Sequence, residues 1–463
     1  MPDAGPTYQL ARFVEELSFS DLPKDVVRKT KECVLDTLAA ILAGVPENST
    51  KIMAKFVQRI SAEAESSLVG FDAKAPSYLA ALVNGVAAHG AEFDDFHSRS
   101  AVHPGCMVLP AALAEAERID AKGADFLVSV LAGYEVMIRV GLGCLGTGFD
   151  RGFHPTGTCG PFGAAAAAAK ILGMDAKQTS NAFGLVGSQA GGLMQFMLSG
   201  SWVKRLHAGW TALTGVMSSR MARDGYTGPI DVLEGKYGYC RAYSTKYDTT
   251  AITRDLGKVY ETLKVQPKVY PCCSELFSPI DAALGIMKEN RLEPSDVQRI
   301  DVRGISIATD FCYNPREKKT RPATNVDAQF SLPFAVATAI HHQRASLPEF
   351  SSEEIMNEQV LQLADKVYAT LDQELNAMFP GRAPAIVKIT TRSGKSFAAR
   401  VNDSKGTPEN PMNHKELEEK FRICSAAASM SHETAEEVIR TVANLEDLQS
   451  VKMLTKMLSA WKA

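Results

Sequence analysis

The sequence predicts a mostly α-helical protein that carries a smaller α/β domain. Helical patterns fill residues 1–265, and segments rich in β-branched residues first appear beyond residue 266. Helical patterns then return after a polar linker. We therefore expect a helical domain over residues 1–265 that is completed by residues 404–463, with a smaller α/β lid domain over residues 266–403.

The N-terminal helices carry clear start and stop signals. Residues 20–44 place apolar side chains on one face, with Pro23 near the first turn and Gly44 at the end. Residues 75–90 predict an apolar helix that runs directly into a cluster of ionisable residues. Further helices are expected over residues 108–118, 126–142 and 160–173. Their many alanines and glycines favour helices packed closely in a mostly α core.

The C-terminal part mixes strands with helices. Strands are expected over residues 298–305, 385–391 and 396–401, the last two as a hairpin. A helix is expected over residues 351–367. A linker over residues 402–413 then leads to a helix over residues 414–427, for which Asn413 is the expected N-cap.

The composition excludes several classes of protein. With 50 basic and 53 acidic side chains, no strong field attracts nucleic acid or an anionic membrane. The N-terminal residues resemble neither a secretory signal nor a transit peptide, and we expect no membrane-spanning helix. The nine cysteines are scattered without a C-x-x-C motif, which favours free thiols. We expect a cytoplasmic globular protein.

One short stretch gathers ionisable groups. Residues 89–104, HGAEFDDFHSRSAVHP, hold three of the nine histidines and three carboxylates. The apolar segments on both sides predict that this stretch runs along the core, where such groups need partners or a chemical task. A metal site is one alternative, because His89 and Glu92 lie three positions apart, as in one half of a di-iron site. The second half of such a site is not found elsewhere in the sequence. We therefore predict no metal here, and an acid–base cluster and a solvated loop are the remaining alternatives.

Three other segments add candidate ligands. In residues 150–163, His154 precedes a Gly-rich turn into an alanine helix, where backbone N–H groups can bind an anion. No Gly-Lys-Ser/Thr sequence follows, which argues against nucleotide binding. Lys204, Arg205 and Lys268 stand beside apolar residues. Together with the acid–histidine cluster, these cations indicate a site for a small polyanion.

The chain resembles the MmgE/PrpD family, which includes 2-methylcitrate dehydratase, cis-aconitate decarboxylase and iminodisuccinate epimerase. The matching motifs span nearly the whole chain in the family's order: FDD…H…HP, GFHPTGTCGPFGAAAAAAKILG, VKRLHAG, KVYPCC, DAQFSLPFAVA and GTPENPMNHKELEEKF. The resemblance implies a helical domain with a smaller α/β lid domain, usually as a homodimer, and a reaction that needs no cofactor.

The resemblance also implies a role for each matching residue. His103 and His154 match the family histidines and would move protons, while Asp94 would orient a histidine or tune its pKa. The residues expected to bind substrate are Glu92, Asp95, His97, Lys204, Arg205 and Lys268. Two positions depart from the family pattern, with Phe96 in place of a common threonine and Phe277 in place of a common histidine. The sequence DDFHS favours the fungal cis-aconitate decarboxylases, although Phe277 departs from them too.

The family's reactions share one chemical core. A carbon flanked by carboxylates gains or loses a proton, cations hold the substrate's carboxylates, and a histidine acts as acid or base. Dehydration, decarboxylation and epimerisation differ mainly in the shape of the pocket, so the sequence leaves all three open. A non-catalytic member that only binds a carboxylate is also open. In each case the expected ligand is a small polycarboxylate.

Overall fold

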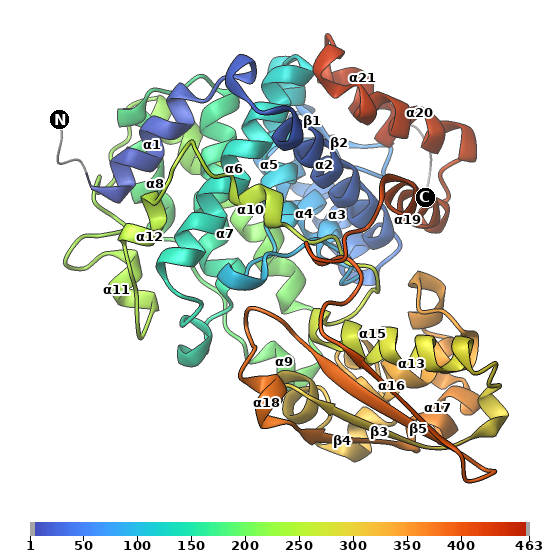
Figure 1. Cartoon of the computed structure of the whole chain (residues 1–463). Helices are drawn as coiled ribbons and strands as arrows, with labels where there is room; N and C mark the ends of the chain where they lie inside the picture. Colours follow the sequence, from blue (N-terminus) through green and yellow to red (C-terminus); the bar gives the residue numbers. More distant parts are fainter. Residues whose placement is uncertain (1–4, 460–463) are drawn as a thin grey trace. The chain divides into compact units, whose positions relative to one another are not determined.

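A computed structural model describes residues 5–459, which form two compact units (Figure 1). The helical unit comprises the described residues up to Val265 and those from Asn413 onward. The α/β unit comprises Gln266–Met412. The chain therefore leaves the helical unit once and returns to complete it with its last helices.

The return to the helical unit begins later than the expected residue 404. Residues 404–412 belong to the α/β unit, where the backbone N–H of Lys405 donates to Asp281 Oδ2 at 2.8 Å. Gly406 has a φ of +95°, and a Cβ there would lie 2.7 Å from the carbonyl oxygen of Pro267. The segment that the composition indicated as a polar linker is therefore packed against the α/β unit.

Helices dominate the helical unit. Its α-helices are α1 (Pro6–Glu16), α2 (Lys24–Gly44), α3 (Asn48–Ile60), α4 (Ser77–Ala88), α5 (Gly105–Ile119), α6 (Gly123–Gly143), α7 (Pro155–Ile171), α8 (Ala176–Gly187), α9 (Phe196–Ser199), α10 (Val203–Arg223), α11 (Tyr239–Tyr243), α12 (Thr250–Thr253), α19 (His414–Ala427), α20 (His432–Ala443) and α21 (Val451–Ser459). A two-stranded antiparallel ribbon joins β1 (Ser66–Ser67) to β2 (Lys74–Ala75). As predicted, α2 ends at Gly44.

Small residues bring the central helices close together. Helix α10 packs against α4, α5 and α7. A Cβ on Gly85 of α4 would lie 2.8 Å from the Cα of Gly209 on α10. A Cβ on Gly209 would lie 2.4 Å from the carbonyl oxygen of Leu82. Larger side chains would separate these two helices, and both of them carry residues of the candidate site.

One apolar helix bears on the expectation of no membrane-spanning segment. Among the described residues, α6 is long and apolar enough to cross a membrane by length and composition, with a mean hydropathy of 1.5. However, 94% of its apolar window is buried inside the structure. Core helices of globular proteins pass the same test.

The α/β unit is built on a four-stranded mixed sheet. The strands β3 (Val297–Gly304), β4 (Val367–Leu371), β5 (Ala385–Thr391) and β6 (Ser396–Val401) take the order β4-β3-β5-β6. Strand β3 pairs in parallel with β4, and the other pairs are antiparallel. The helices of this unit are α13 (Phe277–Glu289), α14 (Arg316–Lys319), α15 (Asn325–Gln329), α16 (Leu332–His342), α17 (Glu358–Ala364) and α18 (Gln373–Asn376). Helix α13 packs against the hairpin and against α16.

Local signals in the C-terminal part give mixed outcomes. The predicted hairpin is formed by β5 and β6, and Asn413 caps α19 through a reciprocal capping box with Glu416. The helix expected over residues 351–367 is wrong in its bounds. It is a short α17, and Val367 already begins β4. A parallel partner strand next to it overrides the helical pattern there.

Candidate active site

His89, Asp94 and His103 form the centre of the candidate site. His89 ends α4, and the other two lie on the segment between α4 and α5. Asp94 Oδ2 lies 2.8 Å from His89 Nδ1 and 3.3 Å from His103 Nδ1. His89 and Asp94 are fully buried, whereas the His103 side chain keeps 16% of its surface exposed. His103 is therefore the member of the three that a solute can reach.

The charges in this trio follow from burial and pairing. Burial favours the neutral forms of both His89 and Asp94. For Asp94, the interactions with His89 and His103 outweigh burial and hold the pKa of the carboxyl well below its usual range. For His89, burial dominates over the attraction of Asp94 and lowers the pKa to about 4. At neutral pH an ionised Asp94 thus accepts a hydrogen bond from the Nδ1–H of a neutral His89.

Asp95 forms a backbone hydrogen bond with His103 and is itself fixed by two donors. Its side-chain oxygens accept hydrogen bonds from the backbone N–H of Gly105 (2.9 Å) and from the hydroxyl of Tyr134 (2.7 Å). Its backbone carbonyl accepts the Nδ1–H of His103 at 2.9 Å. This bond leaves Nε2 as the nitrogen of His103 that can exchange a proton. Burial and the charge of Asp36 raise the pKa of Asp95 to about 7. Both side-chain oxygens of Asp95 thus have protein donors, and its expected role as a substrate ligand stays a prediction.

A second pair of histidines adjoins the first. His154 is the N-cap of α7, and its Nδ1 lies 3.1 Å from Nδ1 of His207 on α10. The ring of His154 stacks against that of His89, with centroids 6.1 Å apart. Burial and the charge of Lys204 lower the pKa of His154 well below its usual value and that of His207 to about 4. Both rings are therefore neutral near pH 7, and one donates to the other.

Lys204 supplies the positive charge of the site. It lies in the first turn of α10, is 8% exposed, and forms an ion pair with Glu92. Burial is the main cause of the low pKa of His89, and the charge of Lys204 lowers this pKa further. Glu92 has a φ of +55°, a left-handed conformation that costs a residue with a side chain about 1 kcal/mol or more. Backbone strain of this kind is concentrated at functional sites.

Three helix N-termini bring these groups together. His103 lies two residues before α5, His154 caps α7, and Lys204 lies in the first turn of α10. The backbone N–H of His103 also donates to Thr156 of α7 at 3.2 Å. Helix N-termini carry partial positive charge and favour bound anions. Their arrangement suits a ligand that carries several carboxylates.

Two predicted residues have their contacts outside this cluster, and a third belongs to the other unit. His97 contacts Ser100 (2.8 Å) and Glu261 (3.6 Å). The Nη1 of Arg205 is 3.0 Å from Glu47 Oε2, at the start of α3. Lys268 belongs to the α/β unit, where it is buried, as is Phe277 at the start of α13. The contacts of His97 and Arg205 do not support their expected roles as substrate ligands.

One group of residues could hold a metal ion. His89, Asp94 and Cys106 each offer a ligand atom, all within 4.8 Å of one another. Burial and the nearby carboxylates raise the pKa of the Cys106 thiol well above its usual value. A metal ion would have to displace that thiol proton, because the thiolate is the ligand. The absence of a metal stays a prediction.

Two histidines of the cluster were not among the predicted site residues. His207 follows Lys204 by three positions in one helix, so helical spacing alone places both on one face. His89 opens the same sequence stretch as Asp94. Tyr134 comes from the middle of α6, and no local pattern marks it.

Comparison with known proteins places the chain in a family. Residues 8–251 match the MmgE/PrpD N-terminal domain and residues 270–447 match the MmgE/PrpD C-terminal domain. The chain therefore belongs to the MmgE/PrpD family, as its motifs indicated.

Full-length relatives carry a more particular name. The chain is 28% identical to the cis-aconitate decarboxylase-like protein oryM of Aspergillus oryzae, over 99% of this chain and 98% of that protein. It is 26% identical to the cis-aconitate decarboxylase of Aspergillus terreus, over 98% of this chain and 96% of that protein. It is 28% identical to the cis-aconitate decarboxylase of Homo sapiens, over 98% of this chain and 94% of that protein.

Proposed function

We propose that this chain is a cofactor-independent lyase that decarboxylates cis-aconitate or a closely similar tricarboxylate. The observation that carries the proposal is the convergence of His103, His154, Asp94 and Lys204 within one unit. The full-length relatives named cis-aconitate decarboxylase support the choice of substrate.

The reaction needs one proton and no external electron carrier. The leaving carboxylate of cis-aconitate is attached to a carbon next to the double bond. When that carbon–carbon bond breaks, its electron pair forms a new double bond and the old double-bond pair moves to a carbon beside a second carboxylate. That carbon takes one proton as carbon dioxide leaves. The substrate's own carboxylate spreads the negative charge, so the protein has to supply only cations and an acid.

The described contacts suggest a role for each group. His103 presents Nε2 as the proton donor, because Nδ1 is held by the Asp95 carbonyl. Asp94 holds both His103 and His89 in place. Lys204 exchanges Glu92 for a substrate carboxylate. Negative charge on a bound tricarboxylate opposes the effect of Lys204 on His154 and favours its protonated form.

Product analysis tests the proposal and its alternatives together. The pure protein is incubated separately with cis-aconitate, citrate, 2-methylcitrate and iminodisuccinate, and the products are identified by NMR. We expect carbon dioxide and a five-carbon unsaturated dicarboxylate from cis-aconitate. Water loss from 2-methylcitrate would instead identify a dehydratase, and inversion of iminodisuccinate an epimerase. Binding of cis-aconitate without turnover would identify a non-catalytic member.

We also propose that the chain forms a homodimer through an apolar face of the helical unit. Exposed apolar side chains recur at helical spacing on α3 and α10, namely Ile52, Phe56, Ile60, Leu206, Trp210 and Met217. Large exposed apolar patches are typical of protein interfaces, and these side chains are the proposed contact surface. Light scattering after gel filtration should show a dimer that Trp210→Asp weakens, whereas Tyr237→Asp at a separate exposed site should not. A monomeric wild type would refute this assembly.

The free thiols suggest the compartment. All nine cysteines are free and buried. Free thiols are typical of proteins in reducing compartments, which supports a cytoplasmic location.

A further inference from the structure

A buried lysine from the C-terminal part of the chain reaches the acid-rich segment of the candidate site. Lys420 lies on α19 and is 4% exposed. Its Nζ is 2.6 Å from Oδ1 of Asp36 on α2 and 2.7 Å from the backbone carbonyl oxygen of Phe93. It also lies 4.2 Å from the centroid of the Phe93 ring.

The Phe93 carbonyl lies between two residues that form the main contacts of the candidate site. It lies between Glu92, which pairs with Lys204, and Asp94, which pairs with two histidines. Glu92 has the left-handed φ of +55°. A strained backbone conformation persists only when surrounding contacts stabilise it. The charged hydrogen bond from Lys420 to the Phe93 carbonyl is such a contact.

Helix α2 supports the same segment at a second point. Asp36 pairs with Lys420, and the adjacent Thr37 Oγ1 lies 3.2 Å from the hydroxyl of Tyr134. That hydroxyl donates to Asp95. The segment is thus held at two points, by Lys420 at the Phe93 carbonyl and by Tyr134 at Asp95.

Stability alone gives a weak reason for this arrangement. Burying two charges costs about as much as their attraction returns, and an apolar pair of the same volume is often as stable or more so. What an apolar pair cannot do is donate to the Phe93 carbonyl.

We propose that Lys420 is a positioning residue that fixes the backbone between Glu92 and Asp94 and thereby sets the geometry of both the ion pair and the histidine cluster. The proposal deepens the proposed function and rests on it. It assigns a role at the site to α19, a helix that follows the α/β unit in the sequence, whereas the reacting groups all come from before that unit.

The test separates positioning from stability. Lys420→Met alone leaves Asp36 buried without its cation, so a loss of stability would be mixed with any loss of positioning. The informative variant is therefore Asp36→Leu/Lys420→Met, which removes both charges. The matched control is Lys31→Met/Glu446→Leu. Lys31 of α2 also contacts a carboxylate, Glu446, and a backbone carbonyl, that of Ala443, in the C-terminal part.

For the informative variant we expect a folded protein whose kcat for cis-aconitate falls about 10–100-fold, the range for partners that orient a reactive group. We also expect an altered pH profile of kcat, because a shifted Asp94 would change its hydrogen bond to His89 and its contact with His103. The control should keep both. A folded informative variant with wild-type kcat and pH profile would overturn the proposal.

A second readout does not depend on turnover. The imidazole N–H proton in the His89–Asp94 hydrogen bond should give a downfield ¹H NMR signal in the wild type and in the control. The informative variant should lose or shift it. If the wild type converts none of the four acids, the proposed function fails, and this signal alone then decides: an unchanged signal refutes positioning by Lys420.

Discussion

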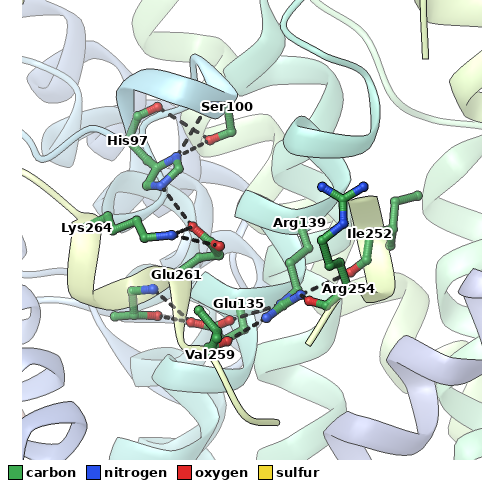
Figure 2. Close-up of polar contacts among 10 residues, drawn as sticks. His97, Ser100, Glu135, Arg139, Ile252, Arg254, Val259, Glu261 and Lys264 are labelled. Carbon is green, nitrogen blue, oxygen red and sulfur yellow. Dashed lines mark hydrogen bonds and ion pairs between the residues drawn. The ribbon is translucent and has the colours of Figure 1, made fainter. Parts of the chain in front are cut away.

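The helical unit contains two buried polar regions that differ in how completely their groups are paired. The histidine cluster consists of His89, Asp94, His103, His154, Lys204 and His207. The arginine network consists of His97, Ser100, Glu135, Arg139, Glu261, Thr262 and Lys264 (Figure 2).

In the arginine network the charged groups are multiply paired. Arg139 contacts Glu135 (3.1 Å) and donates to the carbonyls of Arg254 (2.8 Å) and Val259 (2.6 Å). Glu135 also accepts the N–H and hydroxyl of Thr262, at 2.8 and 2.7 Å. Figure 2 shows how these bonds tie the segment before Val265 to α6.

The histidine cluster is less complete. His89 Nε2 and Asp94 Oδ1 are buried and make no hydrogen bond with the residues that the structure describes. Buried polar atoms without partners are costly and rare in scaffolding, but a reactive site needs groups that can still form bonds. The comparison teaches that completeness of pairing, rather than burial or charge, separates the two regions. It also explains why His97, although it lies in the predicted motif, belongs with the scaffold.

The largest expected effect is on catalysis at His103. His103→Asn keeps some hydrogen bonding but cannot move a proton, so kcat for cis-aconitate should fall about 10²–10⁴-fold. His97→Asn should keep most of the wild-type kcat. Steady-state kinetics measure both variants, and circular dichroism verifies that they are folded. A larger loss of kcat in His97→Asn than in His103→Asn would contradict the assignment of the two regions.

The next effect is on stability at Arg139. Arg139→Met leaves Glu135 without its cation, which should lower the free energy of unfolding by about 3–5 kcal/mol. The folded fraction should keep its kcat. Urea denaturation and kinetics at low temperature measure both, and a loss of kcat without a loss of stability would make the arginine network catalytic.

Asp95 sharpens the comparison, because it touches the cluster yet has protein donors on both side-chain oxygens. Its folded pKa of about 7 lies above its unfolded value of about 3.9, so its stabilising contribution is present below pH 4 and is lost as pH rises to 7. Asp95→Asn removes this loss. Its stability relative to wild type should rise by on the order of 3–4 kcal/mol between pH 4 and pH 7. Urea midpoints that differ equally at both pH values would contradict this.

Lys204 tests whether the cluster binds an anion. Lys204→Met should weaken binding of cis-aconitate by about 1.5–3 kcal/mol, the range for a hydrogen bond to a charged group. Lys264→Met, which removes a lysine of the arginine network, is the control and should bind normally. Calorimetric titration of both variants, and of Lys268→Met, gives the numbers. Equal binding by wild type and Lys204→Met would leave the polyanion site without its cation.

Removal of metal ions should have no effect on turnover. Turnover should survive exhaustive treatment with EDTA, because the predicted chemistry needs no Lewis acid. Activity that is lost and then restored by one divalent metal would give the trio of His89, Asp94 and Cys106 a different task.

Local patterns predicted the two-part fold and drew attention to several residues of the candidate site, because both leave marks along the sequence. Apolar periodicity and capping residues marked α2 and α19, and the stretch 89–104 contained His103 and Asp94. What the sequence could not show was direction. His97 contacts Ser100 and Glu261 rather than the other histidines of the motif. Arg205 pairs with Glu47, although the adjacent Lys204 pairs with Glu92. Adjacent helical residues point about 100° apart, so sharing a motif does not mean sharing a pocket.

The interrupted helical unit has a consequence for the timing of biosynthesis. Lys420 contacts the Phe93 carbonyl from a helix that is translated after the whole α/β unit, Gln266–Met412. At about 5–20 residues per second, that unit alone takes roughly 7–30 s to synthesise. During this interval the segment around Glu92 exists without its lysine support. A chain truncated before α19 should therefore fail to turn over cis-aconitate even if its first helices have already packed.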